Sequence, residues 1–146
     1  MITMVKIIPP LRTTDQQGSG AYGAPRSGGR KHRGVDIACH RGSVVLSVKA
    51  GKVTKIGYPY SPEDKTKGHL RYVELTDVAG YRLRYFYVHP VVTLGDVILT
   101  DEKIGTTQGL TDIYPGITDH FHFEVIFNGE YLDPLLYLQK LERVTG

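Results

Sequence analysis

Two histidines, His120 and His122, are separated by one residue in the segment His120–Phe127. The segment is rich in aromatic and aliphatic residues, which favours a β-strand. Side chains alternate between the two faces of a strand, so both imidazoles should project from the same side. Burying two imidazoles without partners would be costly, whereas a metal ion would satisfy both. The spacing therefore points to a metal site.

A second pair of candidate ligands lies upstream, where His32 and Asp36 are four residues apart. In an extended chain this even spacing keeps both side chains on one face, and the glycine and valine between them argue against a helix. Histidine and aspartate are both good zinc ligands. Within each pair the even spacing puts both side chains on one face of the chain, so the two pairs together predict a metal site. They supply more ligands than a purely structural metal site in such a short chain needs.

His89, at the end of another expected strand, adds a fifth candidate to these two pairs. A catalytic zinc ion is held by three protein ligands and keeps one position open for water. Five groups are two more than that shell needs. The two surplus imidazoles could act as a general base and as a donor to a developing oxyanion. Because zinc lowers the pKa of its water to about 7, the pattern predicts a hydrolase.

Other potential ligands are weaker candidates. Cys39 and His40 point to opposite faces of an extended chain, and Cys39, the only cysteine, has no Cys-x-x-Cys partner. His69 lies in a polar segment, and we expect it to be solvated. Glu124 shares a face with His122 and could orient that ligand from behind. It could equally face a lysine.

The elements that must position these residues are mostly short strands. Period-two alternation bounded by turn residues predicts strands over 2–8, 44–48, 52–56, 71–76, 81–88, 97–99, 103–105, 120–127 and 131–132. Asp77–Gly80 should form a hairpin turn, and Asn128–Gly129 predicts a type I′ turn. Asp133 followed by Pro134 predicts the start of a helix over 133–143, the one helix that we expect. Its apolar stripe consists of Leu135, Leu138 and Leu141.

Composition agrees with a β-rich domain. The chain has 146 residues, of which 40% are hydrophobic, and it contains 17 glycines, 8 prolines and 10 tyrosines. This length suits one compact domain with its own core, and the composition favours β structure rich in turns. We therefore expect a single, mainly β domain over 1–146, with an antiparallel sheet or barrel-sandwich core.

Charge and hydropathy exclude several classes of function. The net charge of +3 is mild, and no aromatic-basic interleaving of the RNA-binding type occurs, so we expect no nucleic-acid partner. No apolar run approaches the roughly 20 residues of a membrane span. The N-terminus lacks the pattern of an export signal, so we expect synthesis in the cytoplasm. Four cations precede Asp36 and could steer an anionic polymer or simply be solvated: Arg26, Arg30, Lys31 and Arg33.

These motifs resemble the lysostaphin-like zinc metalloendopeptidases, which cut peptidoglycan cross-links. The resemblance covers about residues 22–134 and rests on the order of a His-x-x-x-Asp motif, a strand-end histidine and a His-x-His motif. The matching segments are Tyr22–Arg26, His32–Ala38, Gly42–Val53, Arg84–His89, Leu94–Val97, Ile104–Gly105, His120–Glu124 and Asn128–Gly129. The family fold implies a mostly antiparallel β structure, with the site in a groove walled by loops.

The resemblance also implies a role for each candidate. His32, Asp36 and His122 would bind one zinc ion per chain, whereas His89 and His120 would activate water and stabilise the tetrahedral intermediate. Residues of the entering loop would contact the substrate: Tyr22, Arg26, Arg30 and Arg33. The chain departs from the family pattern at Val88 and Pro90, where Tyr-Ala-His-Leu is usual, and at Thr118–Asp119. These changes would alter the groove wall without removing a catalytic group.

The implied function is a zinc endopeptidase acting as a monomer on peptidoglycan, with D-alanyl–meso-diaminopimelate as the expected bond. The implied source is a phage lysis enzyme or virion-associated protein, made in the host cytoplasm and acting on the cell wall after release. Two other readings stay open. One is a catalytically silent, peptidoglycan-binding tail component. The other is a phosphoryl carrier of related barrel-sandwich architecture that uses two histidines.

Overall fold

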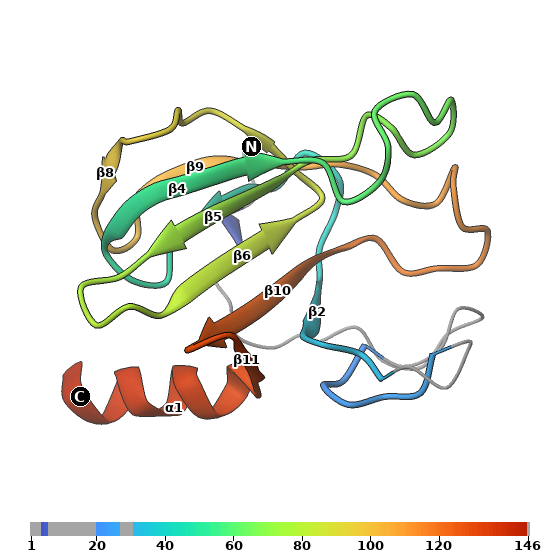
Figure 1. The fold of residues 1–146 in the computed structure, drawn as a ribbon. Helices are drawn as coiled ribbons and strands as arrows, with labels where there is room; N and C mark the ends of the chain where they lie inside the picture. The colour runs from blue at the N-terminus through green and yellow to red at the C-terminus, as the bar shows by residue number, and fades with distance from the viewer. Residues whose placement is uncertain (1–3, 6–19, 27–30, 146) are drawn as a thin grey trace.

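The computed structural model describes residues 4–5, 20–26 and 31–145, which form two β-sheets and one helix (Figure 1). The larger sheet contains β2 (Val35–Ala38), β4 (Gly51–Gly57), β5 (Tyr72–Thr76), β6 (Arg82–Phe86), β8 (Val97–Ile98), β10 (His120–Phe127) and β11 (Glu130–Leu132). The smaller sheet contains β1 (Met4–Val5), β3 (Val44–Leu46), β7 (Val88–Pro90) and β9 (Lys103–Thr107). The helix is α1 (Pro134–Thr145).

Strand β10 is the centre of the site-bearing half of the larger sheet. The sheet order is β11-β10-β6-β5-β4-β8, and β2 pairs with β10 at its amino-terminal half. On its other edge β10 pairs with β6. The smaller sheet has the order β1-β3-β9-β7. Every pairing is antiparallel except that of β1 with β3, which confirms the expected mainly β, antiparallel architecture.

Alternation along β10 separates the core from the site. Phe121, Phe123 and Val125 are fully buried and belong to the hydrophobic core. The ring of Phe123 lies 5.1 Å from that of Tyr85 on β6, centroid to centroid. The alternate residues His120, His122 and Glu124 face the opposite side, as the period of two predicts. The strand therefore anchors the site directly on the core.

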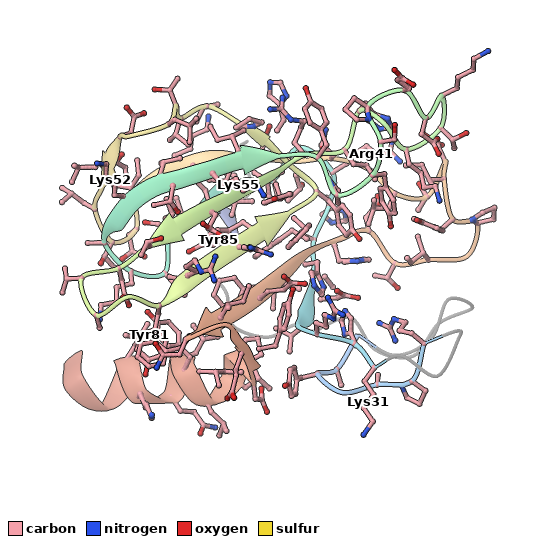
Figure 2. All side chains as sticks on the ribbon, in the orientation of Figure 1. Lys31, Arg41, Lys52, Lys55, Tyr81 and Tyr85 are labelled. Carbon is pink, nitrogen blue, oxygen red and sulfur yellow. The ribbon has the colours of Figure 1, made fainter. Side chains whose placement is uncertain are left out.

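Helix α1 begins where the sequence predicts. The Leu135 N–H donates to the Asp133 side chain at 3.0 Å, which is the hydrogen bond of an N-cap. Its leucine stripe, Leu135, Leu138 and Leu141, packs against the core. Tyr81, between the sheet and α1 in Figure 2, stacks on Phe127 at 4.3 Å and contacts Tyr137 at 5.1 Å. The prediction of this helix is confirmed, apart from two more residues at its end.

Most expected strands form close to their predicted bounds, with one instructive exception. The segment 81–88 is not one strand, because Tyr87 adopts a positive φ of 67° and breaks it. Strand β6 ends in the larger sheet, and β7 continues into the smaller one (Figure 1). The turn at Asn128 and Gly129 has φ of 51° and 78°, in line with the type I′ prediction. Of the expected strand 2–8, only Met4–Val5 lies within the described residues.

Candidate metal centre

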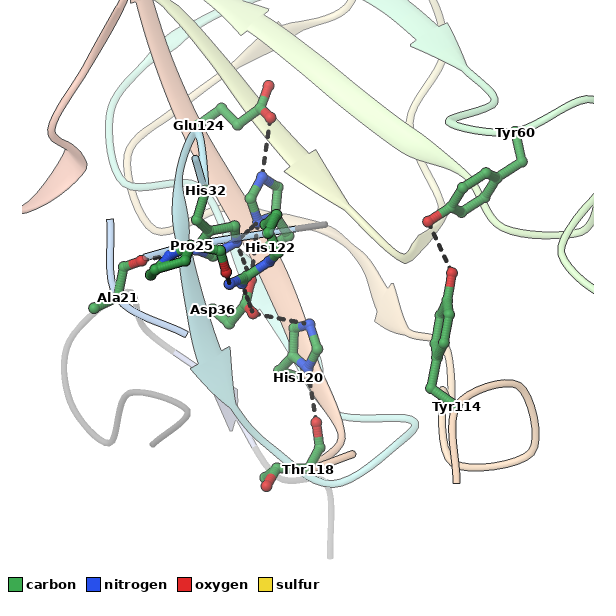
Figure 3. A network of polar contacts seen from close by, with 11 residues as sticks. Ala21, Pro25, His32, Asp36, Tyr60, Tyr114, Thr118, His120, His122 and Glu124 are labelled. Carbon is green, nitrogen blue, oxygen red and sulfur yellow. Dashed lines mark hydrogen bonds and ion pairs between the residues drawn. The ribbon is translucent and has the colours of Figure 1, made fainter. Parts of the chain in front are cut away.

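Three side chains converge on one point beside β10 (Figure 3). Asp36 on β2 lies directly across from His122 in the antiparallel register, and His32 approaches from the segment that precedes β2. The Oδ1 atom of Asp36 lies 3.1 Å from His32 Nε2 and 2.9 Å from His122 Nδ1. The two nitrogens are themselves 2.9 Å apart. All three residues are buried.

The hydrogen bonds behind the two rings decide where their protons lie. The Nδ1 atom of His32 is 2.9 Å from the Ala21 carbonyl oxygen, which can only accept, so Nδ1 donates and Nε2 carries a lone pair. The Nε2 atom of His122 is 2.9 Å from a Glu124 carboxylate oxygen, so it donates there and Nδ1 carries a lone pair. With neutral rings, three acceptor atoms thus face one another with no donor among them. A divalent cation resolves this repulsion, and two imidazoles with one carboxylate suit zinc.

Hydrogen bonds within the cluster shift the pKa values of His122 and Asp36 in opposite directions. Burial alone would lower the pKa of His122, but hydrogen bonds with Asp36 and Glu124 raise it to about 9. Burial alone would raise the pKa of Asp36, and hydrogen bonds from His122 and His32 hold it far below its usual range instead. The site therefore favours a carboxylate beside a positive charge, which a metal ion would supply permanently.

His120 occupies a different position from the three convergent residues. Its Nδ1 atom donates to the Thr118 carbonyl oxygen at 2.7 Å, which leaves a lone pair on Nε2. That Nε2 lies 3.4 Å from Asp36 Oδ2, the carboxylate oxygen turned away from the two other rings (Figure 3). His120 is thus oriented at the edge of the cluster, where a general base would stand.

Glu124 acts behind the cluster. One of its oxygens accepts from His122, whereas the other, Oε1, is buried and has no hydrogen-bond partner among the described residues. Of the two alternatives that the sequence left open, the geometry supports the orientation of His122 and not a contact with a lysine. A carboxylate behind a histidine ligand fixes its tautomer and increases its basicity.

Comparison with known proteins identifies the family, since residues 30–134 match peptidase family M23. The chain belongs to peptidase family M23. Leukocyte cell-derived chemotaxin-2 of Mus musculus is 37% identical over 128 residues, covering 88% of this chain and 79% of the relative. An uncharacterized metalloprotease of Haemophilus influenzae is 31% identical over 107 residues, covering 73% of this chain and 21% of that protein.

Solved structures share the fold. The catalytic domain of the antimicrobial peptidase lysostaphin from Staphylococcus simulans superposes with a TM-score of 0.65 at 23% identity, covering 84% of this chain and 90% of that one. A zinc-containing peptidase from Vibrio cholerae gives 0.60 at 22% identity, with 90% and 37% covered. The expected lysostaphin-like β fold is confirmed, and M23 membership supports a metallopeptidase.

In this M23 chain, His89 is predicted to be catalytic and not a metal ligand; it is not one of the three convergent residues, and its role stays a prediction. It is exposed on β7, where it pairs with Thr106 of β9 in the smaller sheet. The half-buried ring of Tyr87 lies beside the site, with its centroid 5.8 Å from that of His120 and 6.5 Å from that of His122. The sequence pattern predicted one continuous strand, and the positive φ of Tyr87 divides it into β6 and β7.

Among the described residues of the entering loop, Arg26 brings a cation to the site. Arg26 Nη2 lies 3.9 Å from Asp36 Oδ2. Arg33 instead lies over the ring of Tyr131, 4.9 Å from its centroid, and the Tyr22 hydroxyl donates to the Tyr131 carbonyl at 3.5 Å. Arg30, also predicted to contact substrate, lies outside the described residues.

No helix in the described part of the chain has the length and hydropathy to cross a membrane.

Sequence reasoning missed a group of tyrosines beside the histidines. The hydroxyls of Tyr60 and Tyr114 are 2.9 Å apart and join the segments 58–69 and 108–118 (Figure 3). Burial raises the pKa of Tyr87 well above its usual 10, and Tyr60 and Asp36 raise it further. No spacing pattern distinguishes these three residues among ten tyrosines.

Proposed function

We propose that this M23 chain is a zinc-dependent endopeptidase that hydrolyses peptide cross-links of bacterial peptidoglycan, with one zinc ion per chain. The observation that carries the proposal is the convergence of three buried acceptor atoms, from His32, Asp36 and His122, on one point. Zinc held there would polarise a scissile carbonyl and provide a water with a pKa of about 7. Family membership and the likeness to the lysostaphin catalytic domain support the same reading.

Three residues of the chain have distinct roles in the proposed reaction. His120 is the general base: it takes a proton at Nε2, while the Thr118 carbonyl holds the ring through Nδ1. Arg26, close to Asp36 Oδ2, supplies positive charge at the edge of the site. Glu124 holds His122 in the tautomer that leaves Nδ1 ready to bind metal.

The proposed bond is the D-alanyl–meso-diaminopimelate cross-link, because carboxylates lie near that cut and Arg26 can contact one of them. An oligoglycine bridge offers no such charge within the cleaved segment. A partly exposed charge pair of this kind contributes about 0.2–1 kcal/mol. The same substrate would place the action of the protein, as a monomer, at the cell wall, in keeping with a phage lysis or virion-associated role.

A second function, a zinc-bearing protein that binds peptidoglycan without cleaving it, is favoured by one specific observation. Two relatives in this comparison are named as chemotaxins and not as peptidases, at 37% and 34% identity. The histidine ligands alone would serve either function, so turnover decides between them.

Digestion of purified sacculi separates the two functions. Zinc-loaded protein should release monomeric muropeptides from diaminopimelate-type sacculi, with fragments identified by mass analysis. A chelator should abolish release, and added zinc should restore it. The exposed His69 offers a matched control, because His69→Ala should cleave like the wild type. Binding to sacculi without any released fragment would establish the non-catalytic alternative.

A further inference from the structure

We propose that Asp119 is a positioning residue for the general base His120: its carboxylate closes the loop 110–118 and thereby fixes the Thr118 carbonyl that holds the imidazole. The inference rests on the proposed function, in which His120 is the base. It gives a role to Asp119, which is one of the two residues before the His-x-His motif where the chain departs from the family pattern.

Asp119 joins the two ends of this loop. Its Oδ1 atom accepts from the Leu110 N–H at 2.8 Å and from the Thr111 N–H at 3.2 Å. Leu110 is fully buried, so this end of the loop is anchored in the protein. The Asp119 carbonyl accepts from the Cys39 N–H at 3.0 Å, which extends the pairing of β2 with β10 by one residue. The carboxylate therefore ties the first residues of the loop to the residue that precedes β10.

Arg41 contacts both the Asp119 carboxylate and the start of the loop. Its Nε atom lies 3.7 Å from Asp119 Oδ2, and its Nη2 atom donates to Thr111 Oγ1 at 2.7 Å. Gly109 packs so closely on the guanidinium that a Cβ at position 109 would lie 2.4 Å from its Cζ atom. The Arg41 side chain is half exposed, so its charge contributes little to stability. Its contacts instead restrict where the carboxylate and Thr111 can lie.

The interior of the loop is held by turns and by a contact at its tip. The Tyr114 N–H donates to the Leu110 carbonyl at 2.9 Å, and the Ile117 N–H donates to the Tyr114 carbonyl at 3.1 Å. At the tip, the hydroxyl of Tyr114 lies 2.9 Å from that of Tyr60 (Figure 3). Thr118 itself is exposed, so the closure of the loop, and not packing of the Thr118 side chain, determines where its carbonyl lies.

The position of this carbonyl decides the orientation of His120. It accepts from His120 Nδ1 at 2.7 Å, which leaves the lone pair on Nε2 at the edge of the cluster (Figure 3). If the carbonyl moved, the imidazole could rotate or exchange its tautomer. A general base must lie within hydrogen-bond reach of the proton that it takes. Misplacement of a catalytic group by about 1 Å can lower the rate by about 10²-fold.

The test compares Asp119→Ala, Asp119→Asn and a matched control, Asp112→Ala. Asp112 lies in the same loop and pairs with the same Arg41, but it is exposed and caps no backbone N–H in the described structure. Asp119→Ala should keep its zinc and its KM and lose kcat by about 10²-fold, with kcat expressed per bound zinc. Asp119→Asn keeps an oxygen for the two N–H groups and should restore most of the activity. Asp112→Ala should behave like the wild type.

Two results would overturn the role of Asp119 in an active enzyme. One is wild-type kcat in Asp119→Ala, and the other is an equal loss of kcat in Asp119→Ala and Asp112→Ala. Melting temperatures show whether each variant is folded at the assay temperature. If Asp119→Ala does not fold, Asp119→Ser replaces it, because the serine oxygen ends one bond short of the carboxylate oxygens.

A second measurement does not depend on turnover. The nitrogen chemical shifts of the His120 ring, recorded on zinc-loaded protein with labelled histidine, report which ring nitrogen carries the proton. The wild type and Asp119→Asn should show the single tautomer protonated at Nδ1, whereas Asp119→Ala should show a mixture of both tautomers. If the wild type cleaves no sacculi, the peptidase function fails, and the ring nitrogens alone decide the role of Asp119. An unchanged tautomer in Asp119→Ala overturns the proposal.

Discussion

Strand β10 and the strand pair β6–β7 carry the same alternating sequence pattern, but only one of them keeps it in space. β10 stays in a single sheet, with β2 and β11 along one edge and β6 along the other, so His120 and His122 share a face as predicted. The segment 81–90 passes from the larger sheet to the smaller one at Tyr87. Alternation predicts which face a side chain lies on only while the strand remains in one sheet. A single residue with a positive φ is enough to end the strand.

The largest expected effect comes from the ligands on the regular strands. Asp36→Ala and His122→Ala should each lose stoichiometric zinc, measured by elemental mass spectrometry, and with it all cleavage of sacculi. Two remaining ligands do not complete the three-residue shell of a catalytic zinc. His40→Ala, at an exposed histidine next to β2, is the matched control and should keep its zinc. Full zinc content in both ligand variants would break the assignment of β2 and β10 to the metal site.

His120 shares its face with His122 but should not bind metal. His120→Ala is expected to retain one zinc per chain and to lose kcat by about 10²–10⁴-fold, the usual contribution of a positioned base. Zinc content and steady-state kinetics on the same preparation check both halves of the prediction. Loss of zinc from His120→Ala, with zinc retained in His32→Ala, would mean that the roles of these histidines are exchanged.

Glu124 is the third member of the same face, one step further from the metal. Glu124→Ala should weaken zinc binding by about 10–100-fold, as expected when the residue that orients a histidine ligand is removed. Competition with a chromogenic chelator measures the affinity. Glu130→Ala, at an exposed glutamate in the hairpin after β10, should bind zinc like the wild type. Equal affinity in both variants would limit Glu124 to a structural role.

The register of β7 can be tested through Gly105. Gly105→Ala places a methyl group against the His89 carbonyl and the Val88 side chain, and such overpacking costs about 1–3 kcal/mol. Urea unfolding of the metal-free protein measures the change. Gly129→Ala, at a positive φ with open space around it, separates backbone strain from steric clash. Wild-type stability in Gly105→Ala would show that β7 can move, and would weaken the contrast between the two regions.

The smallest effect is a pH dependence confined to the metal-free protein. The pKa of His122 is raised from 6.5 to about 9 in the folded state. Its proton therefore stabilises the fold fully below about pH 6.5, and this contribution is lost as the pH rises through 9. Melting temperatures from pH 6 to 10 should fall for metal-free protein and much less for zinc-loaded protein, in which the ring is bound without that proton. Identical profiles would contradict the position of His122 in the metal site.

The sequence predicted well wherever structure depends on near neighbours. The N-cap at Asp133, the positive φ at Asn128 and Gly129, and the common face of the β10 histidines all follow from interactions within a few residues. That His122 and Asp36 belong to one site was supported by the even spacing within each pair of candidate ligands and by the family resemblance. The break of the strand 81–88 at Tyr87 was not predictable, since the backbone of Tyr87 is held by hydrogen bonds to Arg71 and Gln108, which lie in other segments.

What the amino-acid sequence by itself determined is therefore the set of donors and the faces on which they lie. The β fold, the helix start and the five candidate groups follow from residue types and short-range spacing, whereas the choice of three ligands among them was implied by the family resemblance. Tertiary structure alone decided that His32 Nε2 and His122 Nδ1, 90 residues apart in the chain, lie 2.9 Å from each other, and that the ring of Tyr87 lies beside that of His122. The physical reason is that the convergence of side chains depends on strand pairing and on the backbone conformation of single residues. The hydrophobic periodicity of the sequence predicts neither.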